Sequence, residues 1–202
     1  MLNWKVPKLW PNSKVFILGG GPSLNQMDFS GLKDHWVIGV NNSAFIGDFV
    51  DVLFFGDCKW YDHNREAIRA FGGIKVTTCN RSQSFPGVNH VFPGGKSQGL
   101  FPNPQRIVWN RNSGAAAINL AMHFGASRIV LLGYDMRVVD GKHNWHNDHP
   151  TTPPESIYEK RFLPVFPAIA KDAKRFHLEI VNATPGSALL DFPMVSLEDE
   201  LK

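Results

Sequence analysis

The sequence predicts an α/β fold, a three-layer Rossmann-like domain with a predominantly parallel sheet. Short, uninterrupted apolar runs recur along the chain, and such runs are typical of strands that are buried on both faces of a parallel sheet. Segments with helical spacing separate several of these runs. The first run, at 14–20, leads into the glycine-rich stretch GGGPSL at 19–24, which is the kind of turn that follows a strand in many nucleotide-binding domains.

The expected strands are the segments richest in valine, isoleucine, leucine and phenylalanine. KVFILGG is the first of them, and RIVLLGYD near position 130 is an equally continuous apolar run. In chain order, strands are expected at 14–20, 36–41, 52–57, 74–78, 89–92, 128–135 and 178–183.

The expected helices lie between these strands, at 28–33 (a short helix or turn), 58–71, 112–125 and 154–176. Gly72 and Gly73 provide a stop for the second of them. Pro164 and Pro167 must break or kink the last one, because proline lacks the N–H that a helix interior needs.

The length of 202 residues suits one domain, 1–202, with long inserted loops at about 93–111 and 136–154. Both loops are rich in glycine, proline, asparagine and histidine, and loops of this length inside a compact domain are usually functional. The second loop follows the carboxyl end of a strand, where open α/β sheets bind their ligands.

Composition excludes several classes of protein. The chain is 43% hydrophobic and 19% charged, so it is globular, and its net charge of +3 comes from scattered residues that do not suggest a nucleic-acid partner. No stretch is long and apolar enough to span a bilayer, and the first residues lack the features of a signal peptide. Cys58 and Cys79 have no metal-binding spacing and suggest a reducing compartment. We therefore expect a cytoplasmic protein.

The glycine-rich turn matches neither of the two familiar phosphate-binding fingerprints. It lacks the Gly-Lys-Ser/Thr ending of a P-loop, and Leu24 stands where a dinucleotide turn needs its third glycine. The next strand ends in Asn41 and Asn42 instead of the acidic residue that would bind ribose hydroxyls, so NAD is disfavoured.

The turn still has properties that suit an anion. Its glycines permit close backbone approach, Pro22 fits a first helical position, and Ser23 adds a hydroxyl near free N–H groups. A purely structural turn is the alternative. The residues concerned are Gly19, Gly20, Gly21, Pro22 and Ser23.

A second candidate anion site is the start of the expected helix 112–125. Ser113 and Gly114 come first, and the small residues that follow allow this helix to pack close to the sheet. Simple capping by Asn112 or Ser113 is the alternative interpretation.

Four stretches occur together in a recognisable order: GGGPSL at 19–24, VNNSAF at 40–45, NSGAAAINLAMHFGASRIVLLGYDM at 112–136 and LEIVNATPGSALLDF at 178–192. With these stretches the chain resembles a superfamily that contains Campylobacter-type bacterial sialyltransferases, flagellar motility accessory factors and archaeal hydroxymethyl-dihydropterin diphosphokinases. As a whole it is most similar to uncharacterised proteins encoded by tailed phages and prophages.

The resemblance implies a site. In the sialyltransferases the glycine turn, an asparagine after the second strand and the Ser-Gly helix start bind a cytidine nucleotide sugar, and a histidine after the Gly-x-Asp strand acts as base. Two departures stand out. The transferases have an asparagine where this chain has Gly20, and their segment between the positions of Asp135 and Leu178 is longer.

The second long loop contains the histidine-rich stretch GKHNWHNDHP at 141–150. One histidine, His146 or His149, with His149 slightly preferred, is the candidate general base, because imidazole titrates near neutral pH. Metal binding by His143, Asp148 and the other two histidines is a second interpretation, and solvated loop residues without a task are a third. Trp145 either stacks on a base or sugar ring or anchors the loop.

Four further polar residues are candidates. Asp57 and Asp135 end strands, where a carboxylate can face a ligand or its metal, although Asp135 can equally cap a turn. We favour a catalytic role for Asp135 because of the superfamily pattern. Asn182 and Ser187 are candidate contacts of a nucleobase, with turn formation as the alternative.

These observations favour a transferase that uses a nucleotide donor, specifically a sialyltransferase-like glycosyltransferase with an unknown sugar or glycan acceptor. It would need no cofactor or metal. The first alternative is a Mg²⁺-dependent diphosphokinase in which Asp57 or Asp135 holds the metal. The second is a non-enzymatic phage protein that binds a nucleotide or sugar. Homo-oligomerisation is compatible with each of them.

Overall fold

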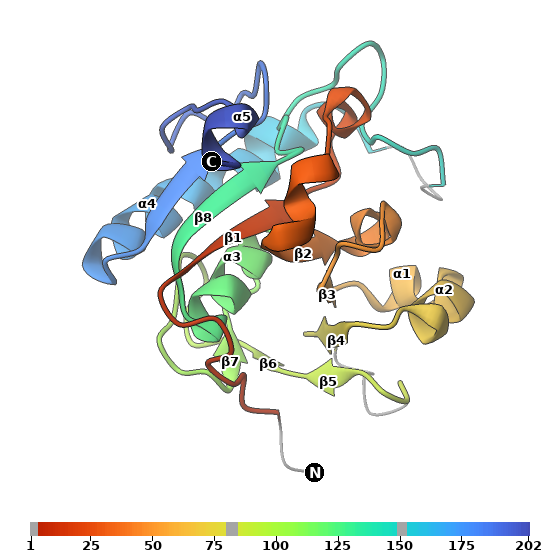
Figure 1. The fold of residues 1–202 in the computed structure, drawn as a ribbon, viewed down its shortest axis with the longest axis vertical. Coiled ribbons are helices and arrows are strands. Elements are labelled where there is room, and N and C mark those ends of the chain that lie inside the picture. Colours follow the sequence, from red (N-terminus) through yellow and green to blue (C-terminus); the bar gives the residue numbers. More distant parts are fainter. Residues whose placement is uncertain (1–3, 80–84, 149–152) are drawn as a thin grey trace.

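A sheet of seven parallel strands forms the centre of the computed structural model, which describes residues 4–79, 85–148 and 153–202 (Figure 1). The strand order is β5-β4-β3-β2-β1-β8-β9, and the predicted fold class is confirmed. The strands are β1 (Ser13–Leu18), β2 (Trp36–Val40), β3 (Val52–Phe55), β4 (Ile74–Thr77), β5 (Asn89–His90), β8 (Ala126–Leu132) and β9 (Glu179–Asn182).

The strand order reverses beside β1. The chain runs outward from β1 to β5, then returns through α3 (Ser113–Phe124) to place β8 on the other side of β1. Val15 of β1 therefore pairs with Trp36 of β2 on one side and with Ile129 of β8 on the other. Ligands of open α/β sheets bind at the carboxyl ends of the strands at such a reversal.

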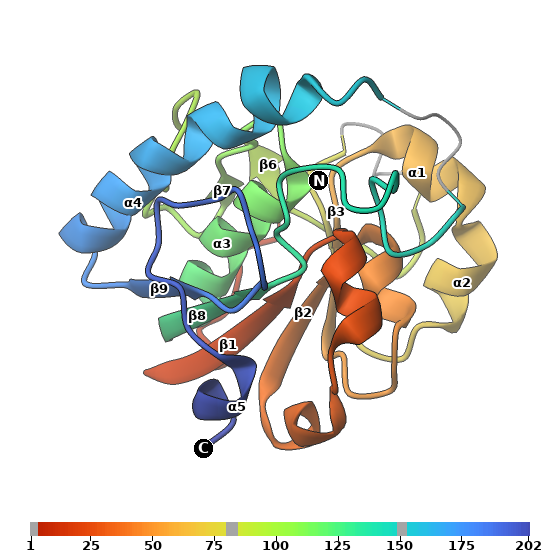
Figure 2. The same ribbon diagram turned by 90° about the horizontal axis from the view of Figure 1, so that it is seen from above.

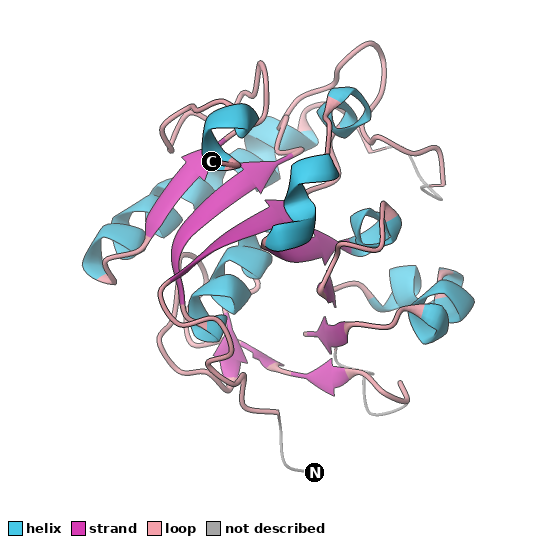
Figure 3. Ribbon diagram, in the orientation of Figure 1, coloured by secondary structure: helices cyan, strands magenta, loops and turns pink. Residues whose placement is uncertain are grey.

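Side chains alternate between the two faces of each strand, so the sheet has a core on both sides. Helices lie on both faces of the sheet (Figures 2 and 3). The helices α3 and α4 (Phe166–Arg175) cover one face and pack on residues such as Ile17 and Leu131. The other face packs on short helices through residues such as Phe16 and Leu132. These short helices are the 3₁₀-helices Pro22–Gln26, Ser30–Asp34 and Asn41–Phe45, together with α1 (Cys58–His63), α2 (Arg65–Ala70) and α5 (Leu197–Glu200).

Several predicted elements are divided in the structure. The helix expected at 58–71 consists of α1 and α2, which meet at Asn64. The segment expected at 154–176 begins with a π-helix, Tyr158–Phe162, and a 3₁₀-helix, Leu163–Val165, and α4 follows them. Pro164 lies within the 3₁₀-helix, which agrees with the predicted break.

The first long loop contains a small parallel sheet of its own, formed by β6 (Phe92–Pro93) and β7 (Arg106–Ile107). The second loop has no helix or extended strand over 136–148 and 153–154, its described part. Among the described residues, no helix combines the length and apolar character needed to cross a bilayer.

Candidate functional site

A cavity of about 370 Å³ lies at the carboxyl ends of the central strands. Its wall includes residues 19–21 after β1, the segment 40–43 at the end of β2, Asp57 after β3 and residues 133–136 after β8. The start of α3, the histidine-rich segment and the π-helix supply most of the remaining wall. The cavity therefore lies where the strand order reverses.

Most of the predicted site residues line this cavity. They are Gly19, Gly20, Gly21, Asn41, Asn42, Asp57, Ser113, Gly114, Asp135 and His146. Pro22, Ser23, Asn182 and Ser187 are described residues that do not line it. His149 lies outside the described residues.

Asn182 and Ser187 have partners within the protein. The Asn182 amide donates to the Leu189 carbonyl at 3.2 Å and accepts from the Thr184 N–H at 3.1 Å. The Ser187 hydroxyl donates to the Tyr134 carbonyl and accepts from the Leu189 N–H at 3.0 Å. Both side chains shape the turn after β9, which is the alternative that the sequence left open.

The glycine-rich turn packs against the turn that follows β8. The Gly21 N–H donates to the Gly133 carbonyl at 2.8 Å. A Cβ on Gly19 would lie 2.5 Å from that same carbonyl oxygen, and a Cβ on Gly21 would overlap the carboxylate of Asp135. Glycine is therefore required at positions 19 and 21 by packing, whatever ligand the turn receives.

Asp135 joins these two turns. Its carboxylate accepts hydrogen bonds from the Ser23 N–H at 3.1 Å and the Ser23 hydroxyl at 2.7 Å. Burial raises the pKa of Asp135, and the two bonds from Ser23 partly offset this effect. Asp135 thus holds the two turns together in addition to lining the cavity. Its predicted catalytic role stays a prediction.

The two asparagines after β2 differ in their contacts. Asn41 has a φ of 54°, and its buried Oδ1 lacks a hydrogen-bond partner in the described structure. Asn42 accepts from Trp60 Nε1 at 2.6 Å, and its Nδ2 lies 3.4 Å from His146 Nδ1. Asn42 therefore holds neighbouring side chains, whereas Asn41 leaves an acceptor for a ligand to use.

The start of α3 meets two cationic side chains. Asn112 caps the helix by accepting from the Ala115 N–H at 3.2 Å, and Ser113 and Gly114 follow on the cavity wall. Arg111 and Arg161 line the cavity beside them, and Arg161 Nε donates to the Arg111 carbonyl at 3.2 Å. The sequence analysis missed both arginines, although the position of Arg111 next to the predicted helix start was an available signal.

In the histidine-rich segment, His143 pairs with Tyr158 of the π-helix. The two rings are stacked, with centroids 5.7 Å apart and planes at 13°. His143 Nδ1 lies 3.2 Å from the Tyr158 hydroxyl, which lies equally close to the His143 carbonyl oxygen. Burial raises the pKa of Tyr158 to about 12, so its hydroxyl stays protonated. Sequence reasoning did not select Tyr158, because nothing local marks it as a partner of a residue in another loop.

His146 has a different environment. Its Nδ1 accepts from the Asp148 backbone N–H at 3.1 Å and faces the Asn42 amide. Trp145 beside it is an anchor, because its indole N–H donates to the Ser43 hydroxyl at 2.9 Å. Trp145 is not among the described residues of the cavity wall, which agrees with the anchoring alternative.

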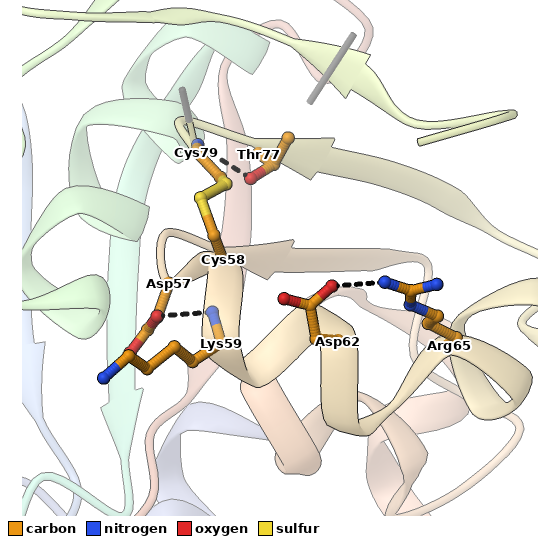
Figure 4. Close-up of a disulfide and its surroundings, with 7 residues drawn as sticks. All are labelled: Asp57, Cys58, Lys59, Asp62, Arg65, Thr77 and Cys79. Atoms are coloured by element: carbon orange, nitrogen blue, oxygen red, sulfur yellow. Dashed lines mark hydrogen bonds and ion pairs between the residues drawn. A yellow bond between two sulfur atoms is a disulfide. The ribbon is translucent and has the colours of Figure 1, made fainter. Parts of the chain in front are cut away.

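A disulfide lies next to the cavity wall (Figure 4). Cys58, the first residue of α1, is joined to Cys79, which follows β4. The two cysteines were interpreted as a sign of a reducing compartment, and the bridge does not agree with that interpretation. They are distant in sequence, but the adjacent strands β3 and β4 bring them together. Asp57 caps the same helix by accepting from the Lys59 N–H at 2.8 Å (Figure 4).

The described residues contain no group of three or more histidine, cysteine, aspartate or glutamate side chains that is placed to hold a metal ion. The two carboxylates that a Mg²⁺ site would use are both engaged, Asp57 with α1 and Asp135 with Ser23. The polar groups on the cavity wall are amides, hydroxyls, backbone groups, two guanidinium groups, two imidazoles and these two carboxylates.

Comparison with solved structures finds the same fold in a sialyltransferase. The structure of CstII from Campylobacter jejuni in complex with a substrate analogue, CMP-3FNeuAc, has a TM-score of 0.57 and 16% identity, over 91% of this chain and 86% of CstII. A point variant of the α-2,3/8-sialyltransferase CstII has a TM-score of 0.52 and 15% identity, over 91% of this chain and 87% of the variant. No protein-family model and no curated protein sequence matches the chain. At this identity the likeness shows a shared fold.

Proposed function

We propose that the protein is a glycosyltransferase that uses a nucleotide-sugar donor, with a CMP-sialic-acid-type donor as the first candidate. One observation carries the proposal. A single cavity at the strand-order reversal brings together the glycine-rich turn, Asn41, the start of α3 and the histidine-rich segment. It does so on the fold of a transferase whose structure holds CMP-3FNeuAc.

The start of α3 is the proposed phosphate site. This helix has 12 residues, its first N–H groups are electropositive, and Ser113 adds a hydroxyl donor. Arg111 and Arg161 place two positive charges on the same wall, where they would bind the phosphate and stabilise the charge of the leaving nucleotide. The unpartnered Oδ1 of Asn41 would accept a hydrogen bond from a ribose hydroxyl or the cytosine amino group.

The geometry favours His143 over His146 as the general base. A backbone N–H always donates, so the bond from Asp148 makes His146 Nδ1 an acceptor and places the proton of the neutral ring on Nε2. The opposite arrangement follows for His143 when the Tyr158 hydroxyl donates to the His143 carbonyl. His143 Nδ1–H then donates to Tyr158 Oη and leaves Nε2 with a free lone pair.

The proposed step is a substitution at the anomeric carbon of the donor sugar. The acceptor hydroxyl loses its proton to a histidine nitrogen as its oxygen forms the new bond to carbon. The bond between that carbon and the phosphate oxygen breaks, and CMP leaves with the electron pair. The proton passes from the histidine to solvent, which returns the site to its starting state.

CMP release from CMP-NeuAc, measured with a panel of oligosaccharide acceptors and with water alone, tests the proposal. We expect acceptor-dependent CMP release that EDTA does not inhibit. Release of AMP from ATP, with the diphosphate transferred to an acceptor hydroxyl and only when Mg²⁺ is present, would support the diphosphokinase alternative instead. Binding of CMP-NeuAc without turnover by any acceptor would indicate a binding protein that kept the fold.

A further inference from the structure

Gly20 and Asn144 are neighbours on the cavity wall. A Cβ built on Gly20 would lie 3.2 Å from Oδ1 of Asn144, and both residues line the cavity. The carboxamide of Asn144 therefore lies next to the space that a side chain at position 20 would enter. A side chain at position 20 would therefore require the Asn144 carboxamide to shift.

The backbone beside Asn144 is held firmly. The Trp145 N–H donates to the Gly20 carbonyl at 3.1 Å, and the Trp145 carbonyl accepts from the Asn25 amide at 2.9 Å. The Trp145 indole donates to the Ser43 hydroxyl at 2.9 Å, and that hydroxyl donates to the Gly19 carbonyl. Figures 1 and 2 both show the loop that follows β8 passing close to the turn after β1.

The Asn144 carboxamide itself has no hydrogen-bond partner among the described residues, and it is only partly exposed. A carboxamide offers two N–H donors and one strong acceptor, which suits a phosphate oxygen and a hydroxyl at the same time. Its neighbour on the wall is Gly20 of the glycine-rich turn. This turn belongs to the part of a Rossmann-like sheet where the nucleotide lies in many nucleotide-binding domains.

We infer that Asn144 binds the nucleotide-sugar donor and contacts its nucleoside monophosphate part. The contact comes from the second long loop and not from the glycine-rich turn. The inference rests on the proposed function. In this chain the carboxamide of Asn144 lies beside Gly20, which has no side chain of its own.

The test is titration calorimetry with two probes, CMP and CMP-3FNeuAc. Loss of one hydrogen bond lowers affinity by about 3- to 10-fold, so Asn144→Ala should weaken both probes by that factor and to the same extent. Asn147→Ala is the matched control, because it removes a carboxamide from the same segment at an exposed position that does not line the cavity. The control should bind both probes as the unmodified protein does.

A swap of the carboxamide sharpens the test. Gly20→Asn in the unmodified protein should weaken CMP binding, because the new side chain competes with Asn144 for the same space. The same change in the Asn144→Ala background should strengthen binding, because a carboxamide returns to that space. This reversal of sign is the expected result. If Gly20→Asn does not fold, as judged by far-UV circular dichroism, the comparison of Asn144→Ala with Asn147→Ala decides.

The outcomes separate the two proposals. If the unmodified protein binds neither probe, the proposed function fails and this assignment fails with it. If it binds both probes and Asn144→Ala binds them equally well, only the assignment is overturned. Weakening of CMP-3FNeuAc without weakening of CMP would also overturn it, since the contact would then be with the sugar.

Discussion

Asp135 is a buried carboxylate that ties the turn after β8 to Ser23. Burial raises its pKa in the folded state above the unfolded value. The folded protein thus binds this proton more tightly than the unfolded chain does. The stability cost of ionisation is therefore absent below the unfolded pKa, near 3.9, and fully present above the folded pKa.

Asp135→Asn tests this description of the carboxylate. The amide keeps the shape and can still accept from the Ser23 N–H and donate to its hydroxyl. The free energy of unfolding of the variant should exceed that of the unmodified protein by the largest amount near pH 7. This difference should shrink as the pH falls towards 4. Urea midpoints across that range measure it. Asp135→Ala, which removes both bonds, should lose about 1–3 kcal/mol of stability. A difference that does not vary with pH would contradict the account.

His143 and His146 can be separated by matched substitutions. His143→Asn should lower kcat by about 2–4 orders of magnitude, as expected for loss of a general base, without changing the affinity for CMP-3FNeuAc. His146→Asn should have a smaller effect on kcat, because its ring is used to hold Asn42 and the loop. Steady-state kinetics with calorimetry of the donor analogue measures both. A larger loss of kcat in the His146 variant, or in a His149 variant, would show that the general base is that residue instead of His143.

At the scale of elements, two contacts hold the helix α1. The disulfide between Cys58 and Cys79 holds its first residue, and Trp60 donates a hydrogen bond to Asn42 on the cavity wall. The bridge spans a sequence separation of 21, for which the chain-entropy model gives a stabilisation of about 3 kcal/mol. Replacement of both cysteines by serine should therefore lower the free energy of unfolding by about 3 kcal/mol, which appears as a lower urea midpoint. Dithiothreitol should reproduce this loss in the unmodified protein and have no effect on the double variant. Equal midpoints for all samples would show that the bridge does not form in solution.

The positions of the elements could largely be predicted from the sequence. The breaks that divide a predicted helix into two or more helices could not. The strands are marked by their apolar runs, and α3 by the cap at Asn112 and the stop at Gly125. The junction of α1 and α2 at Asn64 has no comparably strong signal, since asparagine is tolerated inside helices. The π-helix Tyr158–Phe162 depends on tertiary contacts such as that of Tyr158 with His143, which sequence spacing does not reveal.

At the scale of the whole molecule, a ligand that binds only the folded state stabilises it by mass action. At a CMP concentration of 100 times Kd this amounts to about 2.7 kcal/mol, or about 5–10 °C in Tm for a chain of this size. Thermal unfolding with CMP should show this shift, and EDTA should leave it unchanged. A shift obtained only with ATP and Mg²⁺ would favour the diphosphokinase alternative.

The candidate site could be predicted in part for a simple geometric reason. Parallel strands end at one edge of a sheet, so residues directly after strands, such as Gly20, Asn41 and Asp57, were expected to lie near each other. Asn144 and Arg161 come from segments whose path across that edge depends on long-range packing. The disulfide was missed for a related reason, because pairing of Cys58 with Cys79 follows from the adjacency of β3 and β4.

The central claim is that the cavity at the strand-order reversal is a nucleotide-sugar site. A crystal structure of the protein soaked with CMP-3FNeuAc tests it most directly. We predict the analogue in this cavity, with its phosphate within hydrogen-bonding distance of Ser113 or Gly114 and its nucleotide beside Asn41 and Asn144. An analogue bound only at distant surface lysines, or a cavity without the analogue at saturating concentration, would contradict the account.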